Sequence, residues 1–228
     1  MTPRVLVVAK APVPGRVKTR LAADLGGGAA AEEDAAELAA LALLDTLGAC
    51  AEAVGPDRCH LALAGDLAGA RRADELRRAL DGWRVGPQVG ATFADRLAAA
   101  HAATPGPLLQ VGMDTPQATA GDLAAAADGL ADADAVLGQA TDGGWWLLGL
   151  HDPSAAAVLA GVPMSTSRTG ALTRAALVGR GLRVATTRTL RDVDRVADAD
   201  AVAEEAPGTL FGRAWHDRAA RTTAGGAR

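Results

Sequence analysis

The chain has 228 residues, of which 49% are hydrophobic, and a formal net charge of −4 at pH 7. This length suits one α/β domain with a well-buried core, and the acidic balance excludes the widespread basic surface of nucleic-acid-binding proteins. No apolar run approaches the roughly 20 residues of a membrane helix, so we expect neither a membrane nor a nucleic-acid partner.

Two further features bear on where the protein works. Cys50 and Cys59 form neither a disulfide framework nor a metal-binding spacing. The N-terminus enters a strand directly, without the charged, apolar and cleavage regions of a signal peptide. We therefore expect a cytoplasmic protein.

Strand-like runs alternate with alanine-rich helical runs along the chain. We expect strands at 4–9, 59–64, 83–89, 108–112, 135–139 and 182–187, with an apolar segment at 145–150 that pairs beside the fifth. We expect helices at 29–53, 67–80, 93–103, 120–130, 167–180 and 196–206. Thr119 and Asp122 form a capping box for the fourth helix, and Ser167 is a candidate cap for the fifth.

This alternation predicts an α/β fold with a mostly parallel central sheet and helices on both faces. We expect one domain at 1–206, followed by a C-terminal extension at 207–228 that is loosely ordered at its end. The helix at 29–53 either packs against a second copy in a homodimer or covers the sheet, and both alternatives stay open.

A basic loop follows the first strand. Its cations are Lys10, Arg16, Lys18 and Arg20. Two prolines and Gly15 stiffen and bend the loop, which lies where ligands bind in an open parallel sheet, outside a strand's carboxyl end. A local basic loop in an acidic protein favours a phosphorylated small molecule as ligand. The alternative is a solvated basic loop.

Three acidic segments are candidates for the same site. Asp114 ends the strand at 108–112 and is placed to hold a divalent metal with substrate phosphates, or it is a turn aspartate. Asp192 and Asp194 are separated by one residue, so in an extended segment both carboxylates face the same side. A metal held between one of them and Asp114 would neutralise charge on a phosphoryl group, although Asp194 could only start a helix.

The third acidic segment reads Asp142-Gly143-Gly144-Trp145, followed by a second tryptophan. The glycines permit positive φ and close backbone approach to a ligand, and the indoles offer flat walls for a base or a sugar ring. The alternative is a plain hairpin turn, with the two indoles on opposite faces and one of them in the core.

These segments together resemble a known family. The sequences KAPVPGRVKTRL at 10–21, GMDTP at 112–116, DGGWWLLGL at 142–150 and RDVD at 191–194 resemble, in order, the motifs of a bacterial glycosyltransferase-like family of unknown function, DUF2064. The resemblance covers about residues 4–205. It implies a single Rossmann-like GT-A domain of the nucleotide-diphospho-sugar transferase superfamily, and the chain is also similar to the guanylyltransferase of deazaflavin cofactor synthesis.

The resemblance implies a transferase that depends on Mg²⁺ or Mn²⁺ and uses a nucleotide-activated donor. Lys10, Arg16, Lys18 and Arg20 match the phosphate-gripping loop, with Lys18 and Arg20 as catalytic cations. Asp114 matches the metal-binding aspartate, and Asp192 or Asp194 the second metal position. Ser165 and Thr166 match a segment that lines the acceptor site. The chain departs from the family pattern at Met113, Thr115, Trp145, Trp146, Met164 and Ser167.

Three functions compete at this stage. A loop with four cations favours nucleotidyl transfer from a nucleoside triphosphate to a phosphorylated small molecule, because fixed cations stabilise the departing pyrophosphate. Glycosyl transfer from a nucleotide-sugar to a small acceptor is the alternative. A non-catalytic nucleotide-binding module is the third, and the retained aspartates argue against it.

Overall fold

The structure is a computed structural model of the whole chain. It describes residues 2–225, of which 221–225 as backbone only. Within these residues seven strands form one sheet, in the order β3-β2-β1-β4-β6-β5-β7. The strands are β1 (Arg4–Lys10), β2 (Cys59–Ala64), β3 (Arg84–Pro87), β4 (Leu108–Val111), β5 (Ala135–Ala140), β6 (Trp145–Leu150) and β7 (Val184–Leu190).

Helices lie between the strands in the chain. The α-helices are α1 (Thr19–Asp24), α2 (Gly28–Val54), α3 (Ala73–Ala79), α4 (Phe93–Ala102), α5 (Ala120–Asp132), α6 (Thr169–Gly179), α7 (Val196–Glu205) and α8 (Leu210–Gly225). The 3₁₀ segments are η1 (Pro56–Arg58), η2 (Leu67–Gly69) and η3 (Pro153–Gly161). No helix in the described part of the chain is long and apolar enough to span a membrane.

The sheet is mostly parallel, as the alternation of strands and helices predicts. Only β6 among the described strands runs against its neighbours, β4 and β5, because it follows β5 through a short turn. The strands β1, β4, β5 and β7 therefore all end at the same edge of the sheet. This shared carboxyl edge is where the basic loop and the three acidic segments leave the sheet.

Both faces of β1 are buried, which explains its nearly continuous apolar sequence. Val5 and Val7 pack on the side of α2, α3 and α5. Leu6 and Val8 pack on the side of α4, η3 and α6. Each fully buried side chain of this size contributes about 1.5–3 kcal/mol relative to exposure, so the two faces fix the register of β1.

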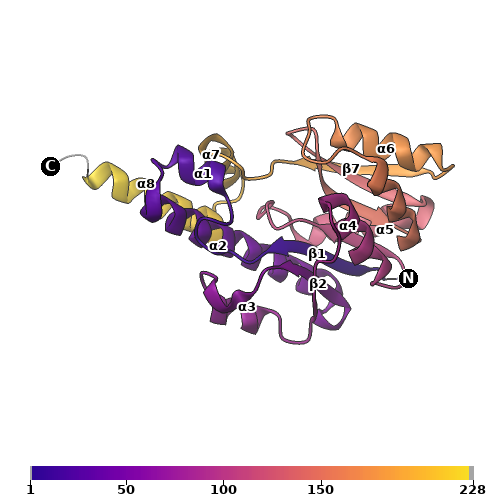
Figure 1. Cartoon of the computed structure of the whole chain (residues 1–228), viewed down its shortest axis with the longest axis horizontal. Helices are drawn as coiled ribbons and strands as arrows, with labels where there is room; N and C mark the ends of the chain where they lie inside the picture. The colour runs from indigo at the N-terminus through magenta and orange to yellow at the C-terminus, as the bar shows by residue number, and fades with distance from the viewer. Residues whose placement is uncertain (1, 226–228) are drawn as a thin grey trace.

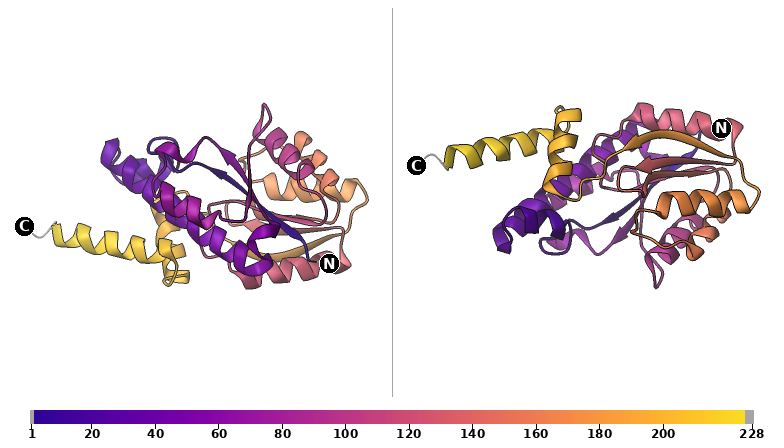
Figure 2. Two further views of the ribbon diagram at one scale, coloured as in Figure 1. Left: turned by 90° about the horizontal axis from the view of Figure 1, so that it is seen from below. Right: turned by 90° about the horizontal axis from the view of Figure 1, so that it is seen from above.

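A helical lobe extends beyond the carboxyl edge of the sheet. It consists of α1, α7, α8 and the first half of α2, whose Leu38 and Ala42 pack with Phe211 and Trp215 of α8. Figure 1 shows this lobe at one end of the molecule, with β1 running towards it, and Figure 2 shows α8 projecting away from the body. The cleft described below therefore lies where the sheet meets the lobe.

The predicted elements hold with local corrections. The helix expected at 67–80 is two pieces, η2 and α3, because Arg72 adopts a left-handed conformation with φ 52° and starts α3 anew. Ser167 does not cap α6, which begins after Arg168. The capping box of Thr119 and Asp122 is present.

The sequence interpretation missed α1, η3 and α8. Helix α8 runs through most of the expected extension at 207–228, with Phe211 and Trp215 buried in the lobe. The loose end expected there falls partly on residues 226–228, which lie outside the described part of the chain. The boundary at residue 206 stays a prediction.

Candidate functional site

The basic loop and two acidic segments meet at the carboxyl edge of the sheet. Lys18 Nζ lies 2.6 Å from Asp114 Oδ1 and 3.4 Å from Asp194 Oδ1. Arg20 Nη1 lies 2.9 Å from Asp194 Oδ2. Contacts between residues more than 90 positions apart thus form one charge network, because β1, β4 and β7 end at the same edge of the sheet.

Lys18 is the buried centre of this network. Its side chain is 8% exposed, whereas those of Asp114 and Asp194 are 42% and 40% exposed. Burial alone lowers the pKa of Lys18, but the carboxylates of Asp114, Asp194 and Asp192 outweigh it, so the pKa is raised above its usual value. Lys18 therefore stays charged at every physiological pH.

The backbone holds Lys18 and its partners in place. Lys18 has φ 48°, a left-handed conformation that costs a non-glycine residue about 1–3 kcal/mol and is concentrated at functional sites. The Val193 amide donates to the Asp114 carbonyl at 2.9 Å. The Gln117 side-chain amide donates to the Arg191 carbonyl at 2.7 Å. The metal-binding candidates on two loops are thus tied together by main-chain contacts.

Asp192 is the most perturbed carboxyl group of the site. Burial, with the neighbouring charges of Asp142 and Asp194, raises its pKa to about 6, although its own backbone amide and Lys18 act in the opposite direction. A carboxyl group with such a pKa is destabilised as an anion, and a bound cation would relieve this.

The basic loop forms part of the wall of a cleft of about 580 Å³. Its walls include every predicted phosphate-binding cation and each predicted metal ligand: Lys10, Arg16, Lys18, Arg20, Asp114, Asp192 and Asp194. The sequence interpretation missed Gln88, Phe93 and Arg96, which also line the cleft. The capping box of Thr92 and Asp95, which starts α4 beside Phe93, was the available signal.

A second hollow of about 210 Å³ adjoins the cleft and shares several of its walls. We call it the acidic cavity, because Asp114, Asp142 and Asp192 all line it. The predicted binding residues Gly144, Trp145, Ser165 and Thr166 line it too. Gly15 and Gly143 are not among the residues that line either hollow.

The glycine pair at 143–144 serves the packing of the loop before α6. A Cβ on Gly143, which has φ 89°, would lie 2.0 Å from the Ser167 carbonyl oxygen. A Cβ on Gly170 would lie 2.5 Å from the Gly144 carbonyl oxygen. The Gly170 amide donates to the Gly143 carbonyl at 2.8 Å. These glycines let Ser167 and the start of α6 pack against the turn. Ser165, in the same loop, has φ 58°.

The two indoles point to opposite faces of β6. Trp146 is 3% exposed and donates from Nε1 to the Arg188 carbonyl at 2.9 Å, so it belongs to the core. Trp145 is partly buried, and both indoles contribute to the wall of the acidic cavity. Asp142 turns back on its own loop, where Oδ1 accepts from the Gly144 amide at 2.7 Å.

The residue set fits a magnesium or manganese ion. Oxygen donors are the ligands that these cations prefer, and Mg²⁺ is commonly held by one or two carboxylates together with substrate phosphates. Asp114 and Asp194 from two loops contact Lys18 Nζ, and Asp192 lines the same cleft. No group of three potential ligands among the described residues is close enough to hold a metal without substrate. A metal at Asp114 and Asp194 would have to compete with Lys18.

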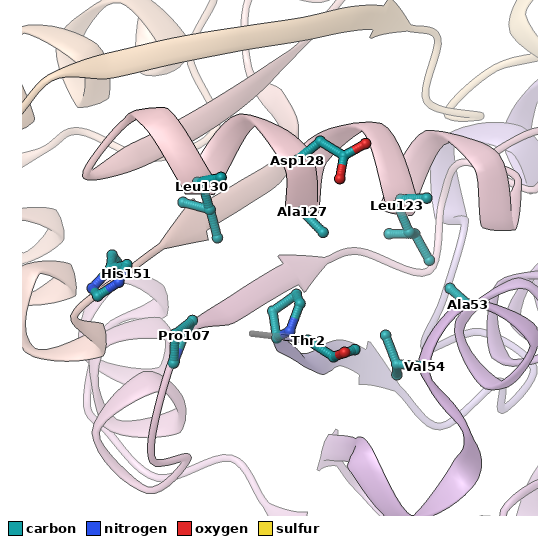
Figure 3. A pocket seen from close by; sticks show the side chains of 12 residues that line it. Thr2, Ala53, Val54, Pro107, Leu123, Ala127, Asp128, Leu130 and His151 are labelled. Atoms are coloured by element: carbon teal, nitrogen blue, oxygen red, sulfur yellow. The ribbon is translucent and has the colours of Figure 1, made fainter.

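A further hollow, of about 400 Å³, lies at the opposite end of the sheet. Figure 3 shows Leu123, Ala127 and Leu130 pointing from one helix towards the strands below it, with Val54 on the side of Leu123 and His151 on the side of Leu130. This end carries the amino ends of β1 and β4, and ligands of open α/β sheets bind at the carboxyl ends instead. We therefore place the functional site in the cleft around Lys18.

Comparisons with known proteins identify the family and the fold of the chain. A family model described as "Uncharacterized protein conserved in bacteria (DUF2064)" matches residues 46–166, just over half of the chain. The matched segment includes Asp114, Asp142 and Ser165. It begins after the basic loop and ends before Asp192 and Asp194. Among curated proteins, none matches the sequence.

Several solved structures share the fold. A structure described as a putative nucleotide-diphospho-sugar transferase from Desulfovibrio desulfuricans G20 superposes with a TM-score of 0.80 and 22% identity over 96% of each chain. A 4-diphosphocytidyl-2C-methyl-D-erythritol synthase from Anaerococcus prevotii gives a TM-score of 0.54 and 11% identity over 87% of this chain and 95% of that one. Rv0371c from Mycobacterium tuberculosis H37Rv, in complex with manganese, gives a TM-score of 0.51 and 19% identity over 88% of this chain and 98% of that one. These likenesses establish a Rossmann-like fold of the nucleotidyltransferase and GT-A type.

Proposed function

Because the chain belongs to the bacterial DUF2064 family and has the fold of nucleotide-diphospho-sugar transferases, we propose that it is a transferase that uses a nucleotide-activated donor with Mg²⁺ or Mn²⁺. The observation that carries the proposal is the contact of Lys18 with Asp114 at 2.6 Å, inside a cleft lined by three further cations of the basic loop. Cations and carboxylates at one point are what a metal-bound phosphate chain requires.

The preferred reaction is nucleotidyl transfer to a phosphorylated small molecule. An oxygen of the acceptor phosphate attacks the α-phosphorus of a nucleoside triphosphate, the bond from the α-phosphorus to the bridging oxygen breaks, and pyrophosphate leaves with that oxygen. Negative charge builds up on the departing pyrophosphate. In this proposal Lys18 and Arg20 stabilise it, and Lys10 and Arg16, which line the same cleft, hold the phosphates.

Asp114, with Asp192 or Asp194, would hold the cation, whose charge would neutralise the phosphate oxygens around the reacting phosphorus. The raised pKa of Asp192 supports this role, because a nearby cation removes the penalty on its anionic form. The manganese complex of Rv0371c is consistent with a divalent cation in this fold.

Glycosyl transfer is the second candidate. It is supported by the acidic cavity, whose aspartates and Trp145 are suited to a hydroxyl-bearing acceptor. In that reaction the acceptor oxygen attacks the anomeric carbon and a nucleoside diphosphate leaves. A non-catalytic module would need nucleotide binding alone, and the paired carboxylates around Lys18 argue for turnover.

The deciding experiment supplies the purified protein with Mg²⁺, each nucleoside triphosphate and pooled phosphorylated metabolites, while pyrophosphate is followed. Pyrophosphate release supports nucleotidyl transfer, and turnover of nucleotide-sugars instead supports glycosyl transfer. Nucleotide binding without either reaction would leave only the non-catalytic module.

The matched variants are Asp114→Asn and Asp128→Asn. Asp114→Asn should lower turnover at least about a hundredfold, as expected when an electrostatic stabiliser is lost. Asp128→Asn makes the same change at an exposed position at the other end of the sheet and should leave turnover unchanged. Equal activity of both variants would remove the metal assignment of Asp114.

A further inference from the structure

The basic loop is tied to a segment that lies outside the cleft. Pro12 and Pro14 have no N–H to donate, so the loop can form few main-chain hydrogen bonds of its own. Its middle is bonded to another segment, because the Arg71 amide donates to the Pro12 carbonyl at 2.9 Å. Beyond this point the chain turns back, and the Arg16 amide donates to the Val13 carbonyl at 3.0 Å. The position of Arg71 therefore bears on where the cations of the loop lie.

Arg71 precedes a residue with a strained backbone. Arg72 has φ 52°, a left-handed conformation that few non-glycine residues adopt, and α3 starts immediately after it. Such conformations persist only where the surrounding structure enforces them. Glu37 of α2 makes contacts that can do so: its Oε1 accepts from Arg72 Nε at 2.6 Å, and its Oε2 accepts from Arg71 Nε at 3.2 Å. One carboxylate thus holds two consecutive side chains.

The contacts around Glu37 form a network of charges. Arg71 also pairs with Glu33 at 3.2 Å, and Arg72 also pairs with Glu75 at 3.0 Å. Isolated ion pairs on the surface contribute little, whereas a network of several charges can hold a geometry. The side chains of Glu37 and Arg72 are only 27% and 33% exposed, so solvent screens this pair in part. The network therefore connects α2 and α3 to the basic loop through the Arg71 amide.

We propose that Glu37 is a positioning residue of the basic loop. By holding the strained turn at Arg72, it keeps the Arg71 amide against the Pro12 carbonyl and orders the loop that presents Lys18 to the cleft. Glu37, Arg71 and Arg72 are not among the described residues that line the cleft, so they act on a bound phosphate only through the loop. The inference rests on the proposed function, because it takes the basic loop to bind phosphate groups.

Pyrophosphate with Mg²⁺ is the probe, because it uses the basic loop and requires no particular base or acceptor. In calorimetric titrations of the full chain, Glu37→Gln should bind it about three- to tenfold more weakly than the wild type, the value of one or two such ion pairs. The substitution keeps the shape of the side chain and removes its charge. Asp74→Asn is the matched control, because Asp74 pairs at 2.6 Å with Arg77 of the same helix, and its affinity should change by at most about twofold.

Two variants at Arg72 test whether the turn itself matters. Both Arg72→Ala and Arg72→Gly remove the guanidinium group. Alanine disfavours φ 52°, so Arg72→Ala should bind Mg²⁺–pyrophosphate at least as weakly as Glu37→Gln. Glycine adopts this conformation readily, so Arg72→Gly should bind the probe at least about threefold more tightly than Arg72→Ala. If Arg72 acted by its charge alone, the two variants would bind equally.

Amide hydrogen exchange, followed by NMR, gives a measurement that needs no ligand. In Glu37→Gln, the amides of Arg71 and Arg16 should exchange at least about fivefold faster than in the wild type, because the turn and the loop open locally. Amides of β1, such as that of Val7, should keep their rates, which shows that the sheet remains folded. If β1 also exchanges faster in this variant, the comparison of Arg72→Gly with Arg72→Ala decides the inference.

Other results overturn the proposal. These are unchanged pyrophosphate affinity in Glu37→Gln, an equal loss in Asp74→Asn, equal binding by the two variants at Arg72, or unchanged exchange of the Arg71 amide in Glu37→Gln. Failure of the proposed function looks different: the wild type itself then binds no Mg²⁺–pyrophosphate. In that case the exchange rates of the Arg71 and Arg16 amides still decide the inference.

Discussion

Lys18 occupies the space between two carboxylates that are the proposed metal ligands, so it should compete with the metal in the free protein. The variant Lys18→Met keeps the length of the side chain and removes its charge. Without the ammonium group, Asp114 loses the cation that contacts it and Asp194 keeps only Arg20, so these carboxylates should bind a divalent metal more tightly. The same change removes a catalytic cation, so turnover should fall while metal affinity rises.

The magnitude follows from the geometry. Two unit charges 4 Å apart interact by about 1 kcal/mol in water and about 4 kcal/mol at an effective dielectric constant of 20. Lys18 is 8% exposed, but its partners are 42% and 40% exposed, so solvent screens the pair and the lower part of that range applies. About 1–2 kcal/mol corresponds to a five- to thirtyfold gain in metal affinity.

The assay is the electron paramagnetic resonance signal of free Mn²⁺, titrated with protein in the absence of nucleotide. Lys10→Met is the matched control, because Lys10 lines the same cleft but has no ion pair among the described residues. It should change Mn²⁺ affinity by at most about twofold. Weaker or unchanged Mn²⁺ binding in Lys18→Met would refute the competition and, with it, the assignment of these carboxylates as metal ligands.

Three further predictions concern stability. The pKa of Asp192 is raised from 3.8 to about 6, so the folded state binds this proton more tightly than the unfolded state, and the protein loses stability as pH rises from about 4 to 6. In metal-free buffer, Asp192→Asn should therefore raise the melting temperature at pH 7.5 and raise it much less at pH 4. Gly170→Ala places a Cβ 2.5 Å from the Gly144 carbonyl oxygen and should cost about 1–3 kcal/mol in urea unfolding, whereas Gly179→Ala in the same helix meets open space and should be neutral or slightly stabilising. Phe211→Ala removes a side chain that is 1% exposed and should cost about 3–5 kcal/mol in the same assay, a loss that a loosely attached extension would not show.

Local signals predicted most of the strands and helices. The strand at 59–64 has the expected bounds, and the capping box of Thr119 and Asp122 starts α5 as expected. These signals depend on residues within one or two turns of each other. Helix α8 was not predicted, because its apolar face consists of few residues, chiefly Phe211 and Trp215. The surface of α2 against which it packs lies more than 150 residues away in the sequence.

In the candidate site too, local sequence signals predicted some features and distant contacts decided the others. The residue types and the strand ends pointed to Lys18, Asp114 and Asp194 one by one, and their contacts needed the parallel geometry of the sheet. Nothing in the sequence distinguished the buried Trp146 from the partly buried Trp145 on the opposite face of β6. Phe93 and Arg96 reach the cleft from α4, which no motif connects to the basic loop.

By itself, the sequence determined the fold class and the chemical character of the site, because alternating apolar runs and charged strand ends are local properties of the chain. Tertiary structure alone decided that Lys18 is buried between Asp114 and Asp194, that Gly170 packs against the 143–144 turn, and that Glu37 pairs with two consecutive arginines. These features depend on distances between segments that only the packed sheet and helices bring together.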